Sequence, residues 1–107
     1  GQFLQRLKIN LHFESYWNFL SSDVAEANLK TKRWPGHAQE FETAFALAAF
    51  PENVRSDAMQ DQEDKEPLEA TAEAGQVMID AIVEVTAKFV TGMIEGKNVA
   101  EIPPFMP

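Results

Sequence analysis

The stretch from residue 34 to residue 43 holds most of the side chains in this chain that could do chemistry. It reads Trp-Pro-Gly-His-Ala-Gln-Glu-Phe-Glu-Thr and contains one of only two histidines in the chain. The Pro-Gly pair predicts a turn, and the apolar residues that follow recur at helical spacing. Polar groups would therefore lie at the first turn of a helix, where the helix dipole favours carboxylates and anionic ligands.

Four residues of this stretch are candidate site residues. His37 could move a proton, because imidazole titrates near neutral pH, or it could be a structural loop histidine. Glu40 and Glu42 are candidate metal ligands; Glu40 could instead stabilise the helix N-terminus, and Glu42 could instead anchor another ligand. They are two residues apart, about 200° around a helix, so both serve one site only if the helix begins between them. Trp34 could form an apolar wall over a small substrate.

Three other residues keep alternative interpretations. Trp17 could line the same substrate site or belong to the core. His12 lies on the polar face of an alternating pattern, which favours a structural role over metal ligation. The role of Tyr16 stays open.

Composition excludes several classes of protein. The chain has 107 residues, which fits one domain spanning residues 1–107. Its formal net charge of -8, with 17 acidic and 9 basic residues, argues against nucleic-acid binding. Hydrophobic residues make up 45% of the chain, which is typical of a globular protein.

The chain contains no cysteine, so disulfides, thiolate metal sites and cysteine nucleophiles are excluded. That absence suits a reducing compartment, and we expect a cytoplasmic protein. No apolar run is long enough to span a membrane, and the first residues lack the apolar region of a signal peptide. The chain begins with Gly rather than Met, which indicates a processed or partial chain.

Hydrophobic periodicity predicts one strand and three helices. Residues 7–13 alternate, with apolar side chains at Leu7, Ile9, Leu11 and Phe13, which predicts a strand with one face in a core. Helices are expected at 24–29, after a Ser-Ser-Asp start, and from about 40 to 50, where Pro51 ends the second. Residues 51–67 read as an acidic, solvated connector, partly ordered by Val54 and Met59.

The third helix is the clearest element, running from residue 68 to residue 95, where Gly96 ends it. Its length is about 42 Å, and its apolar stripe needs a sheet or partner helices along the whole face. The tail, residues 97–107, is expected to be extended. One strand cannot satisfy its own backbone groups, so the elements form an incomplete α/β unit that either belongs to a larger domain or associates with a second copy.

Residues 37–43, running on through Pro51, Val54 and Arg55, resemble the His-Ala-Gly-Glu-x-Glu-Thr-Ser block of the creatininase (creatinine amidohydrolase) family. Ser15-Tyr16-Trp17 and the C-terminal helix resemble further family segments. The chain departs at Gln39, where the family usually has Gly, and at Ala44, where it usually has Ser. The family's N-terminal half, which supplies a Glu-x-His pair, an Asp and a Gly-His loop for two metals, has no counterpart here.

The resemblance implies the C-terminal part of a three-layer α-β-α fold with few strands and a long final helix. It implies a hydrolase that cleaves a C–N bond in a small cyclic amide or formamide with Zn, Mn or Fe. His37 would be the catalytic residue, Glu40 and Glu42 metal ligands and Trp34 a substrate contact, and this chain alone would be inactive. The alternative is a non-catalytic, homo-oligomeric interaction module without membrane or nucleic-acid partners.

Overall fold

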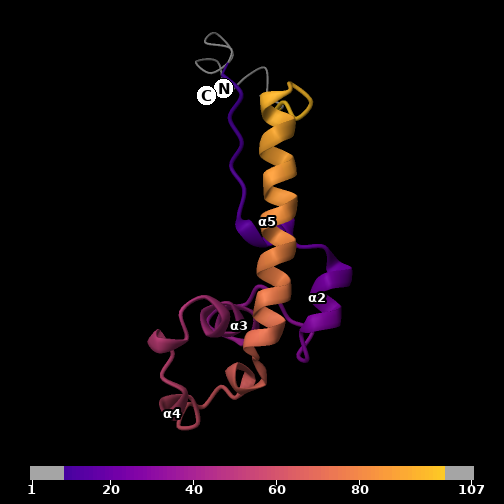
Figure 1. The fold of residues 1–107 in the computed structure, drawn as a ribbon. Coiled ribbons are helices and arrows are strands. Elements are labelled where there is room, and N and C mark those ends of the chain that lie inside the picture. The colour runs from indigo at the N-terminus through magenta and orange to yellow at the C-terminus, as the bar shows by residue number, and fades with distance from the viewer. Residues whose placement is uncertain (1–8, 101–107) are drawn as a thin grey trace, which may run out of the picture.

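The computed structural model describes residues 9–100, and all of its regular secondary structure is helical. The order is η1 (Tyr16–Phe19), α2 (Ser22–Asn28), α3 (Glu40–Ala49), η2 (Pro51–Asn53), α4 (Ser56–Met59), η3 (Glu66–Glu69) and α5 (Ala72–Ile94). Helix α5 forms a long rod, with α2 and α3 beside its N-terminal half (Figure 1). No strand occurs in this part of the chain, so the α/β class and the three-layer α-β-α architecture are wrong.

The predicted strand shows why the fold class was wrong. Residues 9–13 are extended, but no described strand pairs with them; residues 7 and 8 lie outside the described part. The expected faces are also reversed, because Phe13 is 96% exposed whereas His12 packs edge-on against Phe89, with ring centroids 4.9 Å apart. The Asn10 side chain donates to the Asn98 carbonyl at 2.7 Å and accepts from the Ala100 N–H at 2.8 Å. Polar side chains, rather than a backbone ladder, thus hold this segment against the end of α5.

Local signals determine where the helices begin and end. The hydroxyl of Thr71 accepts from the Ala74 N–H at 3.1 Å and caps α5, which ends before Gly96 at φ +77°. The expected start at residue 68 is too early, because residues 66–69 form the separate turn η3. The expected helix at 24–29 is α2, which begins two residues earlier and ends one residue earlier, and the expected helix at 40–50 is α3, which is one residue shorter.

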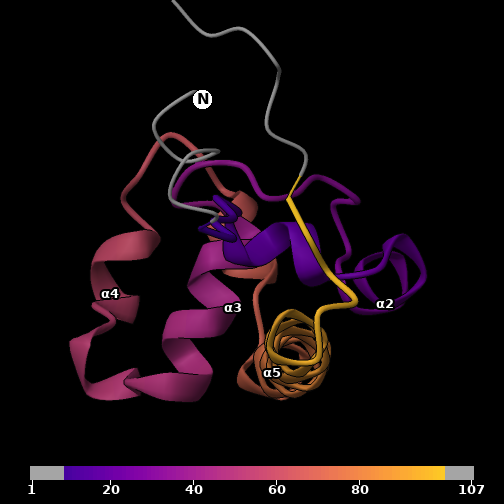
Figure 2. The ribbon, with the colours of Figure 1, turned by 90° about the horizontal axis from the view of Figure 1, so that it is seen from above.

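The core lies where α2, α3 and the first half of α5 meet, and Figure 2 shows α3 and α2 on either side of α5. Helices α3 and α5 approach closely at Gly75, where an added Cβ would lie 1.9 Å from the Ala44 carbonyl oxygen. Only glycine fits there, because the neighbouring atoms are backbone. The buried residues of the core are Leu20, Ala25, Leu29, Phe41, Ala44, Met78 and Ile82.

The molecule is elongated, because this core ends at Ile82, about half way along α5. The radius of gyration is 17.8 Å, against about 13 Å for a compact chain of this length. The second half of α5 extends beyond α2 and α3, with the segment 9–14 beside it (Figure 1). Among residues 9–100, no helix combines the length and apolar character that crossing a membrane requires.

Candidate functional site

The loop from residue 29 to residue 39 is held by a buried carboxylate at the start of α3. Glu40 is 1% exposed, and each of its oxygens accepts a backbone N–H. Lys30 donates to Oε2 at 2.9 Å and Thr31 donates to Oε1 at 2.8 Å. Charge-assisted hydrogen bonds of this kind, together with the dipole of α3, offset the cost of burying the charge.

The second carboxylate of the block also binds backbone. One oxygen of Glu42 accepts the N–H of Ala38, a residue with φ +52°. Glu42 is half-buried, so its other oxygen can still reach a ligand. Glu40 and Glu42 therefore organise two parts of the same loop and do not jointly form one site.

The other two candidates make no hydrogen bond or ion pair with these carboxylates within the described part of the chain. His37 is exposed, and its ring makes no hydrogen bond within the described part of the chain. Trp34 is half-buried against the core, with its ring centroid 6.3 Å from that of Phe41. The roles of catalyst for His37 and of substrate contact for Trp34 stay predictions.

The donors present do not fit a metal ion. Among residues 9–100, no three His, Asp or Glu side chains come together as a group that could hold one. Both oxygens of Glu40 are buried and already accept backbone hydrogen bonds. The prediction of a metal-binding protein is therefore wrong for the described residues, and the prediction of a hydrolase finds no support in them. The Zn, Mn or Fe cofactor was expected of a longer enzyme, and that expectation stays untested.

Tyr16 and Trp17 both belong to the aromatic wall of the core. Tyr16 stacks on Phe41, with ring centroids 5.9 Å apart and an interplanar angle of 15°. Partial burial, and then the negative charge of Glu42, raise the pKa of the Tyr16 hydroxyl above 10.0. Trp17 packs against the same core, which agrees with the core interpretation of that residue.

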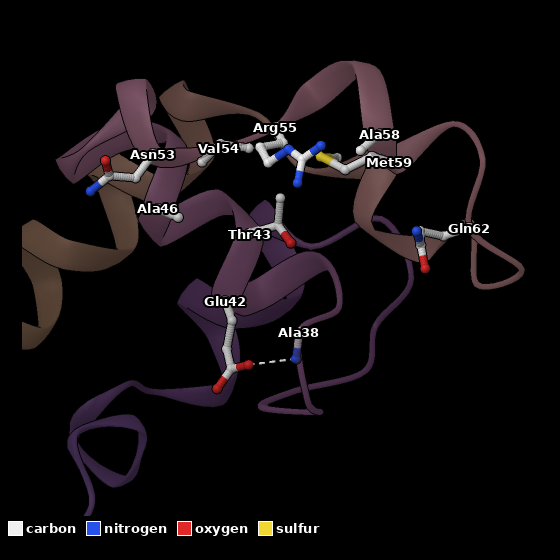
Figure 3. Close-up of a pocket in the computed structure, with 10 residues that line it drawn as sticks. All are labelled: Ala38, Glu42, Thr43, Ala46, Asn53, Val54, Arg55, Ala58, Met59 and Gln62. Atoms are coloured by element: carbon white, nitrogen blue, oxygen red, sulfur yellow. Dashed lines mark hydrogen bonds between the residues drawn. The ribbon is translucent and has the colours of Figure 1, made fainter.

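A cavity of about 460 Å³ lies between α3 and the segment from Asn53 to Gln62. The Arg55 guanidinium lies beside Thr43 at one end, and Glu42 lies at the opposite end (Figure 3). The remaining wall is largely apolar. The lining residues are Ala38, Glu42, Thr43, Ala46, Asn53, Val54, Arg55, Ala58, Met59 and Gln62.

Sequence reasoning missed this cavity because residues 51–67 read as a solvated connector. That segment instead folds into η2, α4 and η3, and its apolar residues Val54, Ala58 and Met59 turn toward α3. The signal available was the recurrence of these apolar residues at steps of four and one within an otherwise acidic stretch.

Searches of family models, of curated proteins and of solved structures find no match to this chain.

Proposed function

We propose that this chain is a non-catalytic, self-associating helical module in which a second copy covers the second half of α5. The observation that carries this proposal is that three of the four exposed large apolar residues there lie on one side of the helix, Val85 being the fourth. Val83 is 61% exposed, Val90 is 46% exposed and Ile94 is 82% exposed. We call these three residues the outer row of α5. Solvated aliphatic side chains at regular spacing along one helix favour a partner that buries them.

The outer row lies on a different side of α5 from the residues that its own chain covers. At about 100° per residue, Val83, Val90 and Ile94 fall within a sector of about 40°. Ile82 and Phe89, which pack toward η1 and the core, lie about 100° away from that sector. Helix α5 is thus apolar on two sides, whereas a surface helix of a single domain needs one stripe.

The spacing of the outer row favours another helix as its partner. Ile79, Val83, Thr86 and Val90 follow one another at steps of four, three and four, the spacing of side chains that interdigitate between two helices. A second copy supplies the same spacing on an equally uncharged surface. A phosphate polymer or an anionic surface would be repelled by the net charge of -8.

The area involved predicts a reversible dimer. The second half of α5, residues 83–94, is about 18 Å long and about 10 Å across, so a like helix laid along it buries on the order of 300 Å² per copy. Stable interfaces of standard size bury about 800 Å² per partner. We therefore expect the 12.0 kDa chain to dimerise in a concentration-dependent way.

The test compares two adjacent exposed residues of α5. Val90→Glu places a charge in the outer row, whereas Thr91→Glu places the same charge about 100° away around the helix. Valine and threonine have nearly the same shape, so the two substitutions are matched. Sedimentation velocity should show a dimer for the unmodified chain and for Thr91→Glu, and a monomer for Val90→Glu. A chain that stays monomeric at all concentrations, or two variants that dimerise equally, would refute the proposal.

A further inference from the structure

The cavity between α3 and α4 has the size and lining of a small-molecule site. Its volume of about 460 Å³ falls within the roughly 300–1,000 Å³ typical of ligand pockets. Ala46, Val54, Ala58 and Met59 supply an apolar wall, and Thr43, Asn53 and Gln62 are the uncharged polar residues of the lining. A mainly apolar wall with few polar groups is the usual composition of such a site.

Arg55 is the cation in this cavity, and among the lysines and arginines of residues 9–100 it alone has a side chain that makes no hydrogen bond or ion pair. Four others pair with carboxylates, in the pairs Lys30–Glu69, Arg33–Glu66, Lys88–Glu84 and Lys97–Glu95. The remaining two, Lys32 and Lys65, donate to backbone carbonyls. In a chain with 17 acidic residues, a guanidinium left without any of them has its donors free for a ligand.

The chemistry of Arg55 selects a carboxylate. A guanidinium presents a planar fork of N–H donors that matches the two oxygens of a carboxylate. Thr43 lies beside the guanidinium and turns its methyl group toward it, while its hydroxyl is directed away from Arg55 (Figure 3). The apolar wall beyond it suits an aliphatic or aromatic body.

Glu42 restricts the ligand to one negative charge. It lies at the end of the cavity opposite Arg55 (Figure 3), and its carboxylate accepts the Ala38 N–H. A ligand with a second anionic group at its far end would place two carboxylates near one another, which costs free energy. We infer that this cavity binds a small organic monocarboxylate with an apolar body, held at Arg55 and excluded from carrying a second charge by Glu42.

The experiment uses three probes of one length with the whole chain: hexanoate, its neutral amide hexanamide, and the dicarboxylate adipate. Binding is followed by saturable shifts of the backbone amide resonances of Thr43, Ala46, Val54 and Met59. Hexanoate should bind at least about tenfold more tightly than hexanamide, the factor that corresponds to the loss of one charge-assisted hydrogen bond. It should also bind more tightly than adipate, whose second carboxylate would lie near Glu42. Equal binding of hexanoate and hexanamide, or no saturable shift with any probe, would overturn the inference.

Substitutions of Arg55 and Glu42, with Lys88→Gln as a control, test whether these two residues determine which probe binds. Arg55→Gln should abolish the preference for hexanoate over hexanamide, whereas Lys88→Gln, which removes the same charge from the exposed side of α5, should leave it unchanged. Glu42→Gln should raise the affinity for adipate toward that for hexanoate. Because Arg55 and Lys88 are both exposed, the amide spectrum of each variant should keep the native dispersion. A hexanoate preference that survives Arg55→Gln would contradict the assignment.

Discussion

The two halves of α5 belong to one continuous helix but have different surroundings. From residue 72 to residue 82 the helix lies between α2 and α3 and contributes Met78 and Ile82 to the core. From residue 83 to residue 94 its contacts come from one side only, through Phe89 against Phe19 and His12. The first half is buried by its own chain, whereas the second half leaves its outer row in water. Stability should therefore be high in the first half and dependent on association in the second.

The largest expected difference in stability between the two halves of α5 comes from substituting the glycine in each half by alanine. Gly75→Ala forces a methyl group into the backbone of Ala44, so α3 and α5 must move apart, and we expect a loss of about 3 kcal/mol. Gly92→Ala meets only the amide end of the Asn98 side chain, 2.3 Å from the added Cβ, and that side chain can rotate away.

Gly92→Ala should leave the free energy of unfolding nearly unchanged. The gain in helix propensity of about 1 kcal/mol offsets the lost hydrogen bond from Asn98 to the Phe89 carbonyl. Urea unfolding of both variants measures the difference. Equal losses of stability would mean that the two halves of α5 are packed alike.

A smaller effect is expected from Glu40, the buried carboxylate at the start of α3, the helix that packs on the first half of α5. Glu40→Gln replaces one acceptor oxygen by an N–H₂ group, which faces the N–H of Lys30 or Thr31, and should cost about 2 kcal/mol. Glu42→Gln makes the same chemical change at a half-buried position and should cost about 0.5 kcal/mol. Thermal unfolding of the two variants distinguishes them, and a larger loss at Glu42 would show that the loop is not held by Glu40.

The smallest effect concerns Tyr16, the only tyrosine in the chain. Burial and the charge of Glu42 raise its pKa above 10.0, so the folded state favours the neutral phenol. This contribution to stability is complete below pH 10 and is lost as the pH rises through the folded-state pKa.

Absorbance at alkaline pH follows the titration of this tyrosine directly. Glu42→Gln should lower the pKa toward 10.0, whereas Glu14→Gln, which removes a charge two residues from Tyr16, should leave it unchanged. A Tyr16 pKa that responds equally to both variants would show that the charge of Glu42 has no specific effect on this hydroxyl.

The sequence predicted the helices of this fold well and its single strand wrongly. Caps and breakers are local signals, so Pro51 and Gly96 gave the ends of α3 and α5 to within one residue. The alternation of residues 9–13 is also local, but a strand needs a partner. Here the Asn10 side chain takes the place of that partner by binding the backbone of Asn98 and Ala100, a contact that spans about 90 residues of sequence.

The candidate site was predicted in part. The block from residue 34 to residue 43 does form a polar loop that enters a helix, and Glu40 does lie at the helix N-terminus. Glu40 binds the backbone of Lys30 and Thr31, however, and no spacing within the block indicates which loop will fold back against it. Arg55 lies across a cavity from Glu42 because α4 turns toward α3, and that turn depends on tertiary packing of Val54 and Met59.

Amide hydrogen exchange at low and high protein concentration tests the central claim most directly. Residues 72–82 should be protected equally at both concentrations, because their own chain buries them. Residues 83–94 should exchange quickly in dilute solution and slowly in concentrated solution, and Val90→Glu should remove this dependence while Thr91→Glu should retain it. Protection of residues 83–94 that does not change with concentration would contradict the claim that a second copy covers this half of α5.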